Sequence, residues 1–286
     1  MCALTTHPAW PFLEKGDRMI VSISQKVMDE ILERAQARVL NLLRGQAECI
    51  SLLSSAHLIV IEDNEIEGCA YRLGGTCFVV QFGALHFVVS TLHGCRNLNY
   101  RPESILYVPD FKEKFAFSYD AILQGKYEKD GDKNEDFVLL RIADLEINKV
   151  GLERVTLKDI KMRKDVCLPG EVKDLFTRGF LYELDTNAID YDSQSISMQA
   201  YTTNGVEYIH KSIWEGCFFV KFKSPKPNCI SGHPNGMSGS PVFGLKHDGT
   251  TGLFGMIIEH DLLSDEFLVL SVEVINSAIR NNWDEV

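Results

Sequence analysis

The sequence predicts an all-β fold, a barrel or a sandwich of short strands. From about residue 56 onward, short apolar runs alternate with turns rich in Gly, Asn, Asp and Pro. In this part of the chain, apolar residues almost never recur at the spacing of a helix, so helices are expected only near the two ends of the chain. Many short strands at such spacing are typical of all-β barrels and sandwiches. With 286 residues the chain can bury a sizeable core in one or two domains.

The N-terminal part of the chain differs from the rest. Residues 1–21 are irregular, whereas residues 22–44 carry apolar side chains at spacings of three and four, with a serine before them and Gly45 after them. This pattern predicts an amphipathic helix of about six turns. Two interpretations stay open: the helix packs on the surface of the β fold, or it serves oligomerisation or partner docking. We therefore assign residues 1–50 to an N-terminal arm and helix.

The strand candidates are apolar runs bounded by turn residues, and they include residues 57–61, 104–108, 177–181 and 216–220. Between them, residues 126–135 are rich in lysine and acidic side chains, which predicts an exposed hairpin or loop. Residues 145–170 are expected to form a linker. A short final helix is predicted at residues 274–281.

The segment GMSGSPVF, residues 236–243, holds a serine between small residues at a turn that leads into an apolar strand. Glycines let the backbone approach a substrate carbonyl closely. A turn of this kind presents the hydroxyl of Ser238 beside backbone amides that can bind a developing oxyanion. Turns rich in Gly and Ser are common before strands, so an ordinary turn is the alternative interpretation.

Two further segments supply a base and an acid. The apolar strand FVVSTLH ends in His93, and Asp136 stands at the start of the apolar strand in NEDFVLLRI. A serine needs a neutral imidazole to take its proton, and a carboxylate on the far ring nitrogen fixes the tautomer. Each residue alone has an ordinary interpretation as a strand-end or turn residue. Together they suggest a nucleophilic triad.

These segments resemble the trypsin-like serine peptidases with the chymotrypsin fold, and bacterial members without a zymogen stage most closely. FVVSTLH is similar to their VVTAAH, EDFVLLRI to DIALLKL, and GMSGSP to GDSGGP, in the family's order His, Asp, Ser. GTCFVV, residues 75–80, is similar to the GTGFVV strand of bacterial members. Residues 252–258 and 267–272 resemble the last two barrel strands.

The resemblance, which covers residues 56–280, implies two six-stranded antiparallel β-barrels with the active site in the cleft between them, plus the two terminal helices. Residues 51–286 then form the peptidase domain, with residues 51–150 in the first barrel and residues 151–286 in the second. It implies a serine endopeptidase that works through an acyl-enzyme without a cofactor. Its catalytic residues would be His93, Asp136 and Ser238, with the amides of Gly236 and Ser238 as the oxyanion hole.

The sequence departs from the family where specificity is set. Met237 replaces the aspartate that pairs with a new N-terminus in animal zymogens, so that activation step is not expected. Gly232 stands where trypsin has its pocket acid, which argues against cleavage after Lys or Arg by that device. Ile257 replaces the histidine of glutamyl endopeptidases. The resemblance places Gly232, Ile258, Glu259 and His260 in the substrate-binding region, although Glu259 and His260 are equally consistent with solvent-facing residues at a strand end.

A function of a different class stays open: a catalytically silent, peptidase-like binding module that acts through its cleft or its N-terminal helix. An α/β-hydrolase is excluded because its triad order is Ser, Asp, His.

Composition limits the partners and the location. The net charge of −11 argues against nucleic acid as a partner. The polypeptide substrate that we expect is what the resemblance to serine peptidases implies. No segment has the apolar length of a membrane span, and the N-terminus lacks the pattern of a secretory signal, so we expect a cytoplasmic protein. The eight cysteines are then expected to be reduced thiols. Cys217, Cys229 and His233 lack a zinc-ligand spacing, so no metal is expected.

Overall fold

The computed structural model describes residues 25–62, 71–96, 105–108, 119–126, 132–143, 156–157, 170, 172–181, 188–190, 195–197, 200–222 and 236–283. The chain divides into two compact units, residues 1–39 and 40–286. The division at residue 150 that the sequence predicts stays a prediction.

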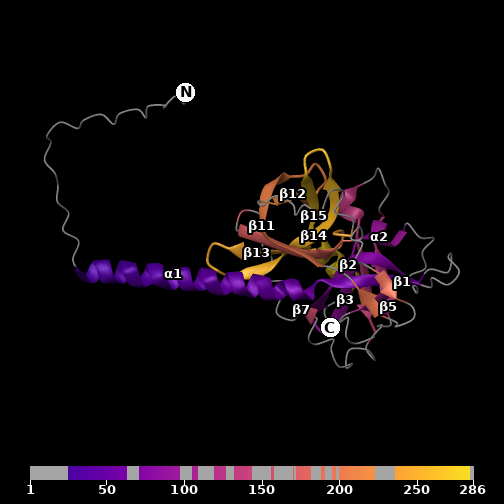
Figure 1. Ribbon diagram of the computed structural model, residues 1–286, viewed down its shortest axis with the longest axis horizontal. Helices are drawn as coiled ribbons and strands as arrows, with labels where there is room; N and C mark the ends of the chain where they lie inside the picture. The colour runs from indigo at the N-terminus through magenta and orange to yellow at the C-terminus, as the bar shows by residue number, and fades with distance from the viewer. Residues whose placement is uncertain are drawn as a thin grey trace. The chain divides into compact units, whose positions relative to one another are not determined.

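Helix α1 (Gln25–Leu52) is present but longer than predicted (Figure 1). Its described side chains from residue 32 to residue 40 are exposed, among them Leu32 and Leu40. The predicted end at Gly45 is wrong, because the helix continues to Leu52. The predicted start of the helix at residue 22 lies outside the described residues.

The reason for the error is a close contact within the second unit. A Cβ atom on Gly45 would lie 2.0 Å from the carbonyl oxygen of Gly249 and 2.6 Å from a methyl group of Leu245. Only glycine therefore allows the helix to approach the turn after β13 (Pro241–Lys246). A glycine inside a helix costs about 1 kcal/mol, and here the packing against this turn offsets that cost.

The first sheet of the second unit has seven strands, and all pairs in it but one are antiparallel. Its order is β4 (Ile105–Val108), β1 (His57–Glu62), β2 (Tyr71–Phe82), β3 (Leu85–Ser90), β6 (Val138–Ile142) and β5 (Tyr119–Gln124). The short β7 (Thr156–Leu157) pairs in parallel with β2, so part of the predicted linker joins this sheet. Within the described strands the sheet is open, and a first six-stranded barrel stays a prediction.

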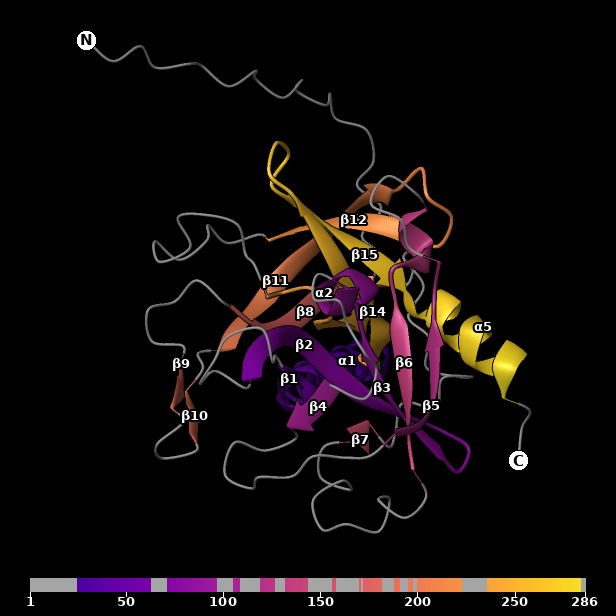
Figure 2. The same ribbon diagram turned by 90° about the vertical axis from the view of Figure 1, so that its right-hand side faces the viewer.

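The strands of the second sheet pair in a closed ring (Figure 2). Its order is β11 (Ala200–Lys211), β12 (Cys217–Phe222), β15 (Glu266–Ser271), β14 (Thr251–Asp261), β13 and β8 (Val172–Phe180). A separate pair consists of β9 (Ala188–Asp190) and β10 (Ser195–Ser197). The prediction of a mainly β, antiparallel fold is confirmed.

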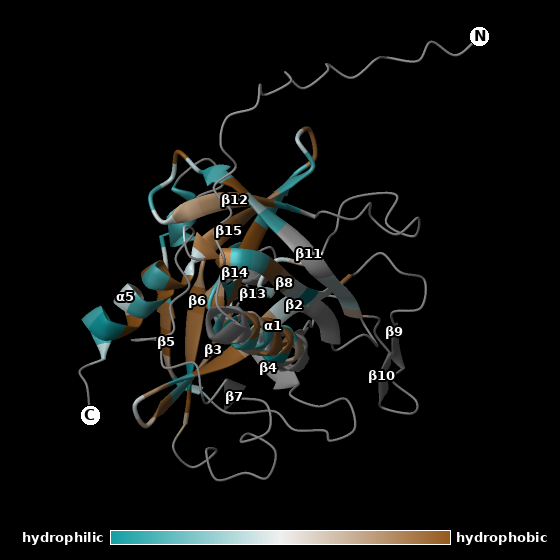
Figure 3. Ribbon diagram, turned by 90° about the vertical axis from the view of Figure 1, so that its left-hand side faces the viewer, coloured by the Kyte–Doolittle hydropathy of each residue, from teal (hydrophilic) through white to brown (hydrophobic). Residues whose placement is uncertain are grey.

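One apolar core cluster joins the two sheets. It contains Phe78 and Phe87 from the first sheet and Met256 and Leu270 from the second. Figure 3 shows that β3, β6 and β15 consist mostly of hydrophobic residues. Most of their side chains are buried. A shared core fixes the facing ends of the two sheets relative to each other, because close-packed side chains resist displacement.

The final helix α5 (Val272–Asn282) covers part of this core and confirms the prediction of a C-terminal helix. Ser271 caps it by accepting a hydrogen bond from the backbone N–H of Glu273. After the helix, the ring of Trp283 packs on Phe87 with a centroid distance of 4.8 Å. In the described part of the chain no helix combines the length and apolarity that crossing a bilayer requires.

Candidate active site

His93 lies in a short helix rather than at the end of a strand. Strand β3 ends at Ser90, and α2 (Leu92–Arg96) begins two residues later. The segment between them is buried, with Thr91 1% exposed and Leu92 fully buried. The packed strand end therefore fixes the position from which the imidazole of His93 projects.

Asp136 reaches His93 because their strands are neighbours. In the antiparallel pair of β3 and β6, Ser90 lies opposite Val138. The chain that follows Ser90, which carries His93, therefore lies beside the chain that precedes Val138, which carries Asp136. Asp136 follows the single turn η3 (Lys133–Glu135) and is 2% exposed. Within the predicted loop of residues 126–135, this turn is the part that leads directly to Asp136.

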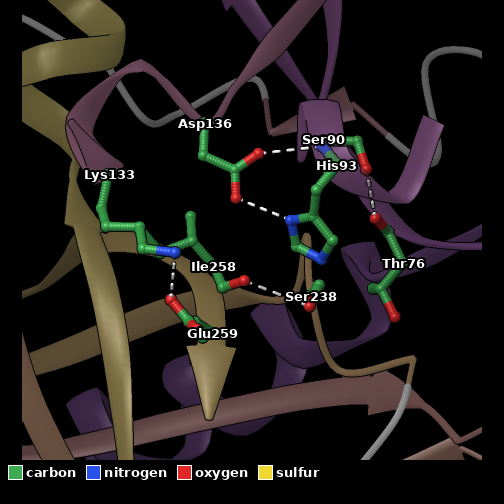
Figure 4. A network of polar contacts seen from close by, with 8 residues as sticks. All are labelled: Thr76, Ser90, His93, Lys133, Asp136, Ser238, Ile258 and Glu259. Carbon is green, nitrogen blue, oxygen red and sulfur yellow. Dashed lines mark hydrogen bonds and ion pairs between the residues drawn. The ribbon is translucent and has the colours of Figure 1, made fainter. Parts of the chain in front are cut away.

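Both carboxylate oxygens of Asp136 bind His93. Oδ2 lies 2.6 Å from the ring Nδ1, and Oδ1 accepts the backbone N–H of His93 at 2.9 Å. A carboxylate at Nδ1 favours the tautomer with its proton on that nitrogen, which leaves Nε2 as an acceptor. Figure 4 shows the Nε2 edge of the ring pointing toward Ser238. The side chain of His93 is 30% exposed, so it is partly accessible to solvent.

Ser238 is presented on a turn that two glycines make possible. Gly236 and Gly239 have φ angles of 98° and 90°, in the region that side chains disfavour. A Cβ atom on Gly239 would lie 1.8 Å from the carbonyl oxygen of Thr76. The N–H of Gly239 binds the carbonyl of Ile257 at 2.7 Å. Both the backbone conformation and the close approach therefore require glycine after the serine.

Thr76, on β2, holds this turn from the other sheet. Its hydroxyl donates to the carbonyl of Gly236 at 2.7 Å, and its backbone N–H donates to the carbonyl of Ser238 at 3.2 Å. The same hydroxyl accepts the N–H of Phe180 at 3.0 Å, and the carbonyl of Thr76 accepts the hydroxyl of Ser90 at 2.7 Å. Thr76 is fully buried, and all its polar groups are bonded. In the sequence, Thr76 appears only as a threonine within an apolar run, which does not predict this role.

The polar groups of the turn divide into two sets. The carbonyls of Gly236 and Ser238 are bound by Thr76. Among the residues that the structure describes, the amides of Gly236 and Ser238 have no hydrogen-bond acceptor. The hydroxyl of Ser238 donates to the carbonyl of Ile258 at 3.3 Å (Figure 4). Two amides on one tight turn beside a hydroxyl can bind an oxyanion that forms there.

The residues predicted to bind substrate have different surroundings. Ile258 contacts Ser238 through its carbonyl. The carboxylate of Glu259 lies 2.9 Å from the ammonium of Lys133, which sequence reasoning did not link to it. The His260 side chain is 7% exposed and binds Asp265 at 3.0 Å, so the prediction of a solvent-facing His260 does not hold. Gly232 lies outside the described residues.

Two of the predicted thiols are described in detail. Cys77 and Cys217 are buried and form no disulfide. Burial, with a smaller contribution from the negative charge of Asp136, raises the pKa of the Cys217 thiol to about 12. Nothing is described for the side chains of the other six. Within the described residues, no three His, Cys, Asp or Glu side chains converge as metal ligands.

Comparisons with known proteins add no assignment. Neither a family model nor a curated protein matches this sequence.

Proposed function

We propose that the protein is a serine endopeptidase, with Ser238 as nucleophile, His93 as base and Asp136 as the group that orients the base. One observation carries the proposal: a buried carboxylate binds both the ring Nδ1 and the backbone N–H of a histidine whose other edge points toward a serine on a glycine turn. These residues come from distant parts of the chain and match the roles of a triad.

In the proposed mechanism, the hydroxyl of Ser238 turns from the carbonyl of Ile258 toward Nε2 of His93. It attacks the scissile carbonyl while Nε2 accepts its proton, and Asp136 stabilises the imidazolium. The imidazolium returns the proton to the leaving amine, which leaves an acyl-enzyme. Water, deprotonated by His93, then attacks the ester and releases the acid. No cofactor takes part in this sequence.

The amides of Gly236 and Ser238 serve as the oxyanion hole. Thr76 binds the carbonyls of the same two residues, so it holds the turn on which these amides lie. A donor of this kind stabilises the transition state by about 3 kcal/mol. The turn is therefore preorganised by a residue of the other sheet.

The proposal includes the fold that the sequence resembles, two barrels with the site in a cleft between them. The edge of β14 supports a substrate path. Strand β13 pairs with one edge of β14 only as far as Met256. Strand β15 pairs with the opposite edge up to Asp261. Among the described strands, none pairs with the first edge beyond Ile257. We propose that an extended polypeptide adds to the other edge, at Ile258 and Glu259.

Labelling with a fluorophosphonate tests the proposal directly. We expect the purified protein to react at Ser238, located by peptide mass spectrometry, and to cleave casein. Ser238→Ala is expected to lose both activities while keeping the wild-type thermal unfolding midpoint. His93→Ala is expected to lose both activities and to have a lower midpoint, because it leaves the buried carboxylate of Asp136 without its ring partner. Casein cleavage by Ser238→Ala at the wild-type rate would refute the assignment.

The same experiment distinguishes the peptidase from the alternative, a catalytically silent binding module. A folded wild-type protein that neither reacts with the probe nor cleaves peptides would support that alternative. The exposed side chains of Leu32, Val39, Leu40 and Leu43 favour α1 as the docking element in that case, because they recur at helical spacing and together form an apolar stripe.

A further inference from the structure

An ion pair connects the two sides of the candidate site. Lys133 belongs to η3, three residues before Asp136, and Glu259 follows Ile258 on β14. Their charged atoms lie 2.9 Å apart (Figure 4). The pair thus joins the turn that carries the acid to the strand that contacts the nucleophile.

The two partners differ in exposure. The Lys133 side chain is 11% exposed, whereas that of Glu259 is 50% exposed. Lys133 is therefore the mostly buried partner, whereas the side chain of Glu259 is half accessible. A charged group bound at one side and open at the other can accept a second cation from a ligand.

A bulge directs Glu259 toward this position. The pairing of β14 with β15 shifts between Ile257 and Glu259. Such an extra residue turns the local side chains away from the regular alternation, and bulges are frequent beside active sites. Here the shift occurs at Ile258, the residue whose carbonyl accepts the hydroxyl of Ser238.

The neighbouring acids are occupied within their own hairpin. Asp261 accepts hydrogen bonds from the N–H of Leu263 and the hydroxyl of Ser264, both at 2.9 Å. Asp265 binds His260. Glu259 is the carboxylate of this hairpin that pairs across to the His93–Asp136 side, so it is the acid placed to contact a ligand near Ser238.

We propose that Glu259 selects a cationic side chain of the bound polypeptide, and that Lys133 holds its carboxylate in place while reducing that selectivity. This inference rests on the proposed function and names its substrate class: polypeptides with Lys or Arg close to the scissile bond, on the part that pairs with β14. The charge on Lys133 opposes a second cation, so the two residues act on selectivity in opposite directions.

The test compares peptides that differ at one position. Lysine is replaced by its neutral isostere norleucine at each of the positions preceding the scissile bond, and the ratio of kcat/KM values is measured at low ionic strength. Glu259→Gln is expected to lower the lysine preference about fivefold, the upper range for a partly exposed ion pair. Lys133→Met is expected to raise it by a similar factor. The double variant is expected to resemble Glu259→Gln.

A second measurement does not depend on catalysis. Dissociation constants of the two peptides for Ser238→Ala, alone and combined with each substitution, should change in the same directions. Arg141→Met is the matched control, because Arg141 forms a 2.6 Å ion pair with Asp120 elsewhere in the first sheet. It should leave the ratio unchanged, which separates selectivity from a general effect of losing an ion pair.

The possible outcomes are distinct. Equal ratios in the wild type and both variants, or shifts in the same direction, would overturn the inference while peptide hydrolysis upholds the proposed function. Failure of the wild type to hydrolyse any peptide or to react at Ser238 would instead overturn the proposed function, and this inference with it. Opposite shifts from Glu259→Gln and Lys133→Met, in both hydrolysis and binding, support it.

Discussion

The two sides of the candidate site are built in different ways. On one side, His93 and Asp136 are held by hydrogen bonds to each other, and their strands bring them together. On the other side, Ser238 is positioned by its backbone, through glycines with positive φ and carbonyls bound to Thr76. The comparison shows that charge orients the imidazole of His93, whereas backbone conformation and hydrogen bonds position Ser238. Substitutions on the two sides should therefore affect activity and stability in different proportions.

The largest expected effect is on the side held by charge. In Asp136→Asn the amide still accepts the backbone N–H of His93, but its NH₂ group faces Nδ1 and favours the tautomer with the proton on Nε2. We expect the rate of fluorophosphonate labelling to fall about 10⁴-fold, as is typical of this change in a serine-protease triad. The unfolding midpoint should change little. A rate within tenfold of the wild type would contradict an orienting role for Asp136.

On the side held by the backbone, Thr76→Val should reduce stability as well as activity. The substitution removes the hydroxyl that binds the carbonyl of Gly236 and the N–H of Phe180, and leaves both groups buried without that partner. We expect a loss of about 2 to 4 kcal/mol in the free energy of unfolding, measured with urea, and slower labelling of Ser238.

Thr177→Val is the matched control for this prediction. Thr177 is also fully buried on a strand, and its hydroxyl donates to the carbonyl of Pro241 at 2.8 Å. It should cost about 1 to 2 kcal/mol and leave the labelling rate unchanged. If both variants slow labelling equally, Thr76 has no special role in holding the turn.

The smallest expected effect is a pH dependence of stability that comes from Cys217, a thiol influenced by the charge of Asp136. The pKa of the Cys217 thiol is raised from 9.0 to about 12, so the unfolded chain loses this proton at a lower pH than the folded protein. The stability contributed by Cys217 is therefore complete below pH 9 and decreases as the pH rises toward 12. We expect the difference in unfolding free energy between the wild type and Cys217→Ala to shrink above pH 9, as measured under reducing conditions. A constant difference would contradict this shift.

The sequence predicted the strands better than the contacts that hold them together. Apolar runs and turns follow local rules, so the mainly β fold and the terminal helices were accessible. The end of α1 was not, because Gly45 is required by a contact with Gly249, a residue far along the chain. The roles of Thr76 and Lys133 likewise depend on partners in the other sheet. Such partners leave no periodic pattern in either segment.

The contact of α1 with the turn after β13 has a consequence for engineering the protein. A Cβ atom on Gly249 would lie 2.7 Å from the backbone of Asn41, so insertions or attached dyes in that hairpin would dislodge the helix. The hairpin between β14 and β15 has no such constraint at its tip, where Leu263 is 98% exposed. A fluorophore or affinity handle is therefore best attached at residue 263, where it also reports on ligands that reach the end of β14.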